Sequence, residues 1–194
     1  YTSLGANWGQ MKASPNGQMI AVAKQSGSNS VALYNFNNST GQITINTAPT
    51  VTGNAYGLSF SPNSQLLYYS DAIGSNLYQY DISTTNTNFL GTSGTNYKQL
   101  QLGPDNLIYF SKFGMNTRLG VINLPNVSGL GGNVVLNGPL LVPPVGINAI
   151  HGLPNMIDAV APPIPTTAFT YVLTSCNTAQ FTLDPCWVGY SASW

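Results

Sequence analysis

Residues Tyr56–Ile82 read YGLSFSPNSQLLYYSDAIGSNLYQYDI and contain three short runs, each of which predicts a β-strand. Leu58 and Phe60 alternate with small residues, residues 66–69 form a short apolar run, and residues 77–82 alternate again. Each run is too short for a helix. The turn sequence SPNS at 61–64 separates the first two runs, and Pro62 lacks a backbone donor, so the chain reverses direction there. We therefore expect an antiparallel meander.

The same unit occurs on both sides of this stretch. Upstream, residues 11–23 are followed by a strand-like run at 30–36, and downstream, residues 100–111 are followed by one at 119–123. The turn prolines Pro15, Pro62 and Pro104 recur after 47 and then 42 residues (62 − 15 and 104 − 62). A period of about 40 to 50 residues is typical of one four-stranded propeller blade. The sequence therefore predicts an all-β chain built from blade repeats.

These repeats give a domain division. We expect a β-propeller region over 1–160, with blades at about 8–51, 53–92 and 96–141 and a partial blade or closing element at 145–158. A proline-rich linker at 161–166 follows, and the strand-like runs within 167–194 predict the start of an Ig-like β-sandwich. Three repeats do not close a propeller of four to eight blades. Further blades upstream of the chain, blades from another chain, and open stacking are the alternatives.

Charge is scarce in this chain. Only 5% of residues are charged, against about 25% in an average soluble domain. Lysines and the single arginine are scattered, which argues against a nucleic-acid partner, because phosphate neutralisation needs clustered cations. No stretch approaches the 18 to 20 apolar residues of a membrane span, and the start without methionine predicts a fragment or processed product. A net charge of zero leaves little repulsion between copies and so permits self-association.

Four segments carry a family resemblance: Met11–Gly17, Tyr56–Asn63, Gln101–Asp105 and Gly152–Asn155. Together they resemble the WD40-like propeller repeats of bacterial gliding-motility-associated surface proteins, in which the propeller ends at a Gly-Leu-Pro-Asn segment. The tail, with Cys176 and the later sequence YSASW at 190–194, resembles the opening of a PKD-type Ig-like module. The Phe-Gly-Asp-Gly stretch with which such a module continues is not present in this chain.

The resemblance implies a large protein exported through a type IX secretion route and displayed on, or released from, the bacterial cell as an adhesin or scaffold. The low charge departs from the family pattern, whose turns carry more Lys, Asp and Glu. This departure favours a role in assembly, such as a filament or sheath component.

The two cysteines, Cys176 and Cys186, both lie in the tail. Their spacing of ten residues (186 − 176) permits a short disulfide ring, which would stabilise a small sandwich by about 2 to 3 kcal/mol. A disulfide implies an oxidising, extracytoplasmic location. A buried pair of free thiols and a metal site are the alternatives, and a metal site would need ligands that the tail lacks.

Catalytic and metal-binding patterns are sparse. His151 is the single histidine and lies in an apolar run. We therefore expect it to be a core residue, and a role as a catalytic base is the alternative. The chain contains no Gly-x-Ser-x-Gly elbow and no Asp-x-Asp-x-Asp-Gly calcium loop. Asp71 or Asp81 could join backbone carbonyls in a calcium site. We expect no catalytic residue and no cofactor, with calcium as the alternative.

Four tyrosines, Tyr68, Tyr69, Tyr78 and Tyr80, cluster in the second repeat. Because side chains alternate along a strand, about half of them should point inward. Packing between blades is one interpretation, and an exposed strip that binds carbohydrate or protein is the other.

Two classes of function follow. The first is a non-enzymatic extracellular surface or matrix protein that mediates adhesion or assembly, with itself or other surface proteins as partners. The second is a propeller-type enzyme, such as a lyase, lactonase or glycosidase, whose catalytic residues lie in further blades. A carbohydrate-binding module that uses the tyrosines is a third, weaker alternative.

Overall fold

The structure is a computed structural model of the 194-residue chain. It describes residues 9–24, 30–49, 54–71, 73–92, 94–114, 117–141, 152–153, 169–175 and 178–183, the last two ranges as backbone only. By its contacts the chain divides into two compact units, Tyr1–Val160 and Ala161–Trp194.

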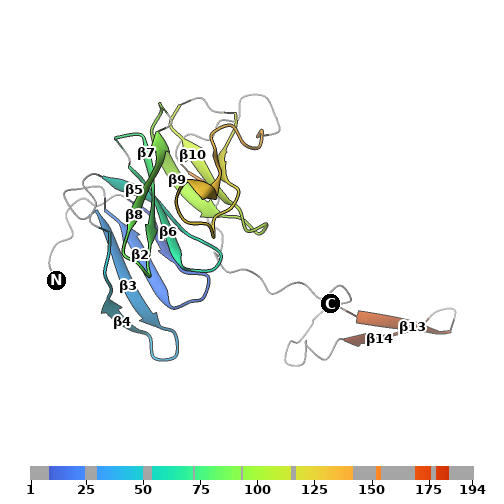
Figure 1. Cartoon of the computed structure of the whole chain (residues 1–194). Coiled ribbons are helices and arrows are strands. Elements are labelled where there is room, and N and C mark those ends of the chain that lie inside the picture. Colours follow the sequence, from blue (N-terminus) through green and yellow to red (C-terminus); the bar gives the residue numbers. More distant parts are fainter. Residues whose placement is uncertain are drawn as a thin grey trace. The chain divides into compact units, whose positions relative to one another are not determined.

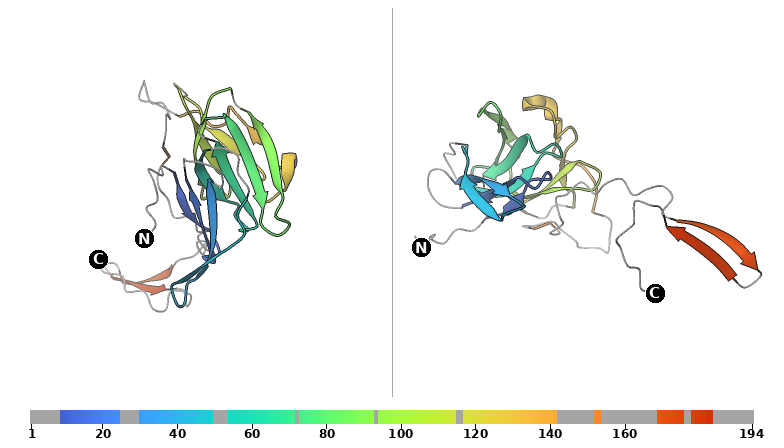
Figure 2. Two further views of the ribbon diagram at one scale, coloured as in Figure 1. Left: turned by 90° about the vertical axis from the view of Figure 1, so that its left-hand side faces the viewer. Right: turned by 90° about the horizontal axis from the view of Figure 1, so that it is seen from below.

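The described part of the first unit contains three four-stranded antiparallel sheets, each with its strands in sequence order (Figures 1 and 2). The first sheet is β1 (Met11–Ala13), β2 (Met19–Ala23), β3 (Val31–Asn37) and β4 (Gln42–Ile45); the second is β5 (Ala55–Phe60), β6 (Leu66–Asp71), β7 (Asn76–Asp81) and β8 (Thr87–Thr92); the third is β9 (Tyr97–Leu102), β10 (Ile108–Lys112), β11 (Gly120–Ile122) and β12 (Val134–Val135). The prediction of an all-β fold with repeated four-stranded meanders is confirmed. A single 3₁₀ turn, η1 (Gly129–Gly132), is the one helical element in the described residues.

The turn between the first two strands has the same hydrogen bonds in the first and second sheets. The Ser61 backbone N–H donates to Leu66 O at 2.8 Å, and Leu66 N–H donates to the Ser61 hydroxyl at 2.9 Å. Ser14 and Met19 make the equivalent pair of bonds at 2.9 and 2.9 Å. The sequence signature Ser-Pro-Asn therefore recurs because a buried serine hydroxyl closes each hairpin.

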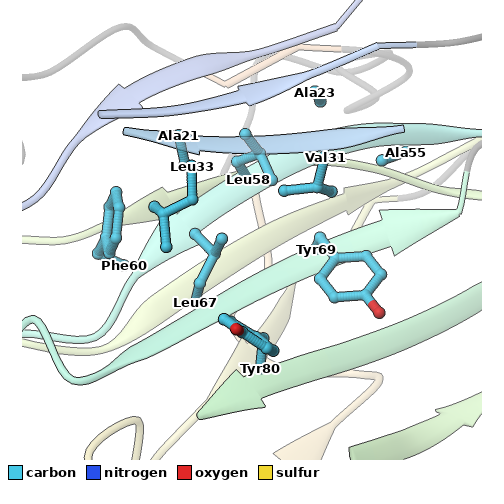
Figure 3. Close-up of a cluster of buried hydrophobic side chains, with 10 residues drawn as sticks. All are labelled: Ala21, Ala23, Val31, Leu33, Ala55, Leu58, Phe60, Leu67, Tyr69 and Tyr80. Atoms are coloured by element: carbon cyan, nitrogen blue, oxygen red, sulfur yellow. The ribbon is translucent and has the colours of Figure 1, made fainter. Parts of the chain in front are cut away.

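Both faces of the second sheet are buried. One face packs on the first sheet, and the contact contains the following residues (Figure 3): Ala21, Ala23, Val31, Leu33, Ala55, Leu58, Phe60, Leu67, Tyr69 and Tyr80. Its other face packs on the third sheet in a second cluster: Leu66, Tyr68, Leu77, Leu90, Tyr97, Leu100, Leu102, Ile108, Phe110 and Ile122. Residues alternate between the two clusters along β6, as a period of two requires.

The first strands of the sheets lie next to one another. β5 contacts both β1 and β9, and the Gln10 backbone N–H donates to Tyr56 O at 2.8 Å. Meanders that stack face to face, with their first strands together, have the arrangement of propeller blades. No helix among the described residues is long and apolar enough to cross a membrane.

The described part of the second unit is one antiparallel pair, β13 (Phe169–Ser175) and β14 (Thr178–Leu183). A two-stranded pair is compatible with several folds. The Ig-like or PKD-type sandwich over 167–194 therefore stays a prediction.

Candidate functional site

Polar residues recur at fixed places on the first strands of the three sheets. The equivalent turn residues are Ser14, Ser61 and Gly103. Two residues before each of them, in the same order, stand Lys12, Ser59 and Gln101. Four residues before each stand Gln10, Gly57 and Gln99. We call Gln10, Lys12, Lys98, Gln99 and Gln101 the inner-strand polar cluster. Lys12, Lys98 and Gln101 are buried and the two other members are partly buried, so we take this cluster as the candidate site.

Gln10 connects the first sheet to both of the others. Its side-chain Oε1 accepts hydrogen bonds from the backbone N–H groups of Leu58 at 2.9 Å and Leu100 at 3.2 Å. Its Nε2 donates to Leu100 O at 3.1 Å. One amide therefore joins β5 to β9 at the point where their backbones approach. A bond of this kind fixes the relative position of two strands that do not share a sheet.

Lys12 makes a second connection between the first and third sheets. The lysine is 4% exposed, and its Nζ donates to Gln101 Oε1 at 2.5 Å. Gln101 Nε2 in turn donates to Leu102 O at 3.0 Å. Gln99 Oε1 accepts from the backbone N–H of Leu153 at 2.7 Å, which places this short described segment against β9.

Lys98 of the cluster and Lys112 are buried in the third sheet, where β9 begins and β10 ends. The Nζ of Lys98 lies 5.4 Å from the ring centre of Tyr56 and 5.5 Å from that of Phe113, which is cation–π geometry. Lys112 Nζ donates to Leu136 O at 2.6 Å and lies 3.4 Å from Asn137 Oδ1. Burial lowers the pKa of both lysines, because the ammonium form loses hydration.

The cluster consists of amides and ammonium groups, and the protein itself supplies hydrogen-bond partners to them. Within the described ranges, no group of three or more His, Cys, Asp or Glu residues could hold a metal ion. Asp71 Oδ1 accepts from Ile73 N–H at 3.0 Å, and Asp81 Oδ1 accepts from Ser83 N–H at 2.9 Å and its hydroxyl at 2.7 Å. The Ser83 hydroxyl is the main cause of a lowered Asp81 pKa. Both aspartates shape turns in this structure.

The four tyrosines do not form an exposed strip. Tyr68, Tyr69 and Tyr80 are at most 2% exposed, and Tyr78 is partly buried. The Tyr68 hydroxyl donates to Pro125 O at 3.0 Å, and the rings of Tyr69 and Tyr78 stack at 5.1 Å. The prediction of a tyrosine binding surface is therefore wrong for the three buried residues. The reason is that both faces of the second sheet are covered, so alternation sends neighbouring tyrosines to two different buried interfaces.

Other predicted residues lie outside the described part of the chain. These are Cys176, Cys186 and His151. The disulfide and the role of the histidine stay predictions.

Sequence reasoning did not single out the glutamines. Gln10 and Gln101 make connections between sheets, Gln99 binds the short segment at 152–153, and Gln79 is fully buried in the second sheet. An available indication was the repeat register, because a glutamine or lysine stands at the same offsets before the turns of the first and third repeats. Identifying the partners requires the three-dimensional arrangement.

No protein-family model and no curated protein matches this chain. Among solved structures, it is similar to hydrazine synthase from Kuenenia stuttgartiensis, with 20% identity, a TM-score of 0.46, and coverage of 62% of this chain and 33% of that one. It is also similar to the Cps50 (Swd1) β-propeller domain of a Myceliophthora species, with 12% identity, a TM-score of 0.45, and coverage of 53% and 36%. A third is virginiamycin B lyase from Staphylococcus aureus, with 17% identity, a TM-score of 0.44, and coverage of 64% and 39%.

These neighbours are β-propeller-like proteins and include enzymes. The chain spans between about a third and two fifths of their length. At such low identity the similarity concerns the fold alone, and it assigns no reaction, ligand or partner to this chain.

Burial of tyrosines predicts a loss of stability at high pH. Burial raises the pKa of Tyr68 and Tyr69 from 10.0 to about 12, because the tyrosinate form loses hydration. The unfolded chain ionises at about 10, so the stability from the neutral phenols is complete below pH 10 and is lost between about 10 and 12. The lysines have the opposite effect: because the pKa of Lys98 and Lys112 is lowered, the free energy of unfolding rises as they lose their protons with increasing pH. This rise is complete near pH 10.5, the ordinary lysine pKa, so it does not offset the loss above that pH.

The free energy of unfolding in urea, followed by circular dichroism, is therefore expected to fall steeply above pH 10.5. Tyrosinate absorbance of the folded protein should lag behind that of the urea-unfolded chain over the same range. Coincident absorbance curves would contradict the burial of these phenols.

Proposed function

We propose that this chain is a non-enzymatic, propeller-type module that mediates assembly or adhesion outside a bacterial cell. The observation that carries the proposal is the distribution of polarity in the first unit. The inner-strand polar cluster is bonded to the protein itself, whereas large apolar side chains lie on the outside. Such a molecule is built to offer surfaces rather than a reactive centre.

Exposed large apolar side chains lie on the first sheet and on β8, and others lie on turns and loops of the second and third sheets. Ile45 is 85% exposed, Met11 70%, Ile43 55% and Phe89 54%. β4 and β8 are the last strands of their sheets, and neither contains a charged residue or a proline. Edge strands are usually protected against pairing by such residues. Their absence supports the proposal that these edges meet other protein surfaces.

The low charge supports the same function. Burying a charged side chain in an interface carries a large desolvation cost, and a surface with few charges avoids it. The extracellular location is proposed from the resemblance to surface proteins and from the predicted Cys176–Cys186 disulfide.

Self-association of the purified chain tests the proposal. We expect sedimentation velocity to show concentration-dependent association that persists when salt is raised from about 0.1 to 1 M, although the Debye length falls from about 10 to 3 Å. Apolar contacts are not screened, and sulfate should strengthen them. Electron microscopy of the same material would show whether the association products are ordered.

A chain that stays monomeric at every concentration and salt condition would contradict an assembly role. Association that disappears in high salt would also contradict it, because the contacts would then be electrostatic.

A further inference from the structure

The first sheet has one face that no described part of the chain covers. Its side chains are all apolar: Met11, Ala13, Ile20, Val22, Ala32, Tyr34, Phe36, Ile43 and Ile45. We call this set the outward face of the first sheet. Met11, Ala13, Ile43 and Ile45 are exposed, and the others are partly exposed. A nine-residue apolar face that spans four strands is far larger than the scattered apolar residues of an ordinary surface.

The equivalent face is buried in each of the other sheets. Five residues of the outward face have an equivalent at the same place in the repeat of each other sheet: Met11, Ala13, Ile20, Val22 and Tyr34. Their equivalents in the second sheet are, in the same order, Leu58, Phe60, Leu67, Tyr69 and Tyr80. Those in the third sheet are Leu100, Leu102, Ile108, Phe110 and Ile122. Every one of these ten equivalents is at most 3% exposed. The outward face of the first sheet therefore has the composition of a face built to be covered.

Two contacts within the chain show what covers such a face. Ala21 and Leu33 of the first sheet pack on the second, and Leu66, Tyr68 and Leu77 of the second pack on the third (Figure 3 shows the first of these contacts). In both cases the cover is the opposite face of the preceding four-stranded sheet. The partner that fits the outward face of the first sheet is thus another sheet of the same repeat.

The chain itself presents a sheet face of that kind. The third sheet has no described sheet beyond it. At the β9 edge of its outer face, Leu153 N–H donates to Gln99 Oε1 at 2.7 Å, as Leu58 N–H donates to Gln10 Oε1. The rest of this face carries Leu107, Tyr109, Val121 and Val135. Leu107, Tyr109 and Val135 are partly exposed, while Val121 is 5% exposed and lies against Gly138. The Tyr109 hydroxyl donates to Asp105 at 2.5 Å at the rim of this face.

We infer that a second copy of this chain places the β10–β12 part of its third sheet on the outward face of the first sheet. This inference rests on the proposed assembly function and specifies its interface. The contact is heterologous: different faces of the two copies meet, so repetition gives a closed ring or an open filament. None of the residues named on the two faces is charged, so charge repulsion between these residues does not oppose the contact.

Two substitutions test the two faces separately. Ile45→Lys places a charge on the outward face of the first sheet, and Thr44→Lys is its matched control, because Thr44 is the exposed neighbour on the other side of β4. Val135→Lys places a charge on the face of the third sheet, and its control is Leu130→Lys on η1, at a residue that is 76% exposed. Circular dichroism and urea unfolding check that each variant is folded.

Sedimentation velocity is then run on each variant and on the mixture of Ile45→Lys with Val135→Lys. We expect each of these two variants to weaken association about 30-fold or more, as at interface hot spots. Both controls should associate like the original chain. The mixture should form a dimer, because each variant contributes the face that the other lacks.

Each other outcome overturns part of the argument. If the original chain does not associate, the proposed assembly role fails, and this inference fails with it. If it associates and Ile45→Lys associates equally well, the outward face is not the interface and this inference fails alone. If Val135→Lys keeps full association while Ile45→Lys loses it, two first sheets meet face to face and the head-to-tail arrangement is wrong.

Discussion

Replacing Gly57 by alanine is expected to destabilise the three-sheet unit by about 3 kcal/mol, the upper part of the range for overpacked positions. A Cβ at this position would lie 2.0 Å from Lys98 O and 2.7 Å from Leu100 Cδ1. The first of these atoms is backbone, so β9 would have to move away from β5. That movement would also break a chain of bonds in which Gly57 N–H donates to the Ser70 hydroxyl at 2.9 Å and this hydroxyl donates to Lys98 O at 2.8 Å.

Urea unfolding followed by circular dichroism measures this loss. Gly132→Ala is the matched control, since a Cβ there would meet its nearest atom at 3.6 Å, an ordinary van der Waals distance. The control should change stability by less than about 1 kcal/mol. Equal midpoints for Gly57→Ala and the original chain would show that β5 and β9 do not approach as closely as described.

The repeats could be predicted from sequence because each one carries its own turn. Pro15, Pro62 and Pro104 each follow a residue that closes a hairpin, and the apolar runs after them became β2, β6 and β10. Turn chemistry and strand length are local properties, so they can be read without knowing the rest of the fold. The stacking of one sheet on the next is a property of the whole chain, and the sequence indicates it only through the period.

The candidate site could not be predicted in the same way. Alternation shows that Tyr68 and Tyr69 lie on opposite faces, but it does not show that another sheet covers both faces. Likewise, alternation along the strand that contains Gln79 assigns this residue to one face but does not show that the face is buried. A glutamine in a strand is usually solvated, and only the packing of a distant segment turns this one into a structural residue.

Gln79 holds a distant loop against the second sheet, and replacing it by methionine is expected to cost about 3 kcal/mol. Its Nε2 donates to the Tyr68 hydroxyl at 2.7 Å and to Val127 O at 2.9 Å, while its Oε1 accepts from Gly129 N–H at 2.7 Å. Methionine has nearly the same length and volume, so the packing is kept and the hydrogen bonds are removed. The buried Tyr68 hydroxyl then loses one hydrogen-bond partner, and the part-buried bonds to Val127 O and Gly129 N–H are lost as well. The cost is about 1 to 3 kcal/mol for a group that water does not reach, and less for one that it does.

The loss should be localised as well as measurable in urea. Gly129 N–H would lose its acceptor, so its hydrogen exchange should accelerate more than that of the β6 and β7 amides, because the loop that contains η1 opens before the sheet does. Gln65→Met removes an exposed amide whose Oε1 accepts from Asn63 Nδ2 at 3.1 Å, and it should change neither readout appreciably. Unchanged protection at Gly129 in Gln79→Met would mean that apolar packing alone fixes the loop.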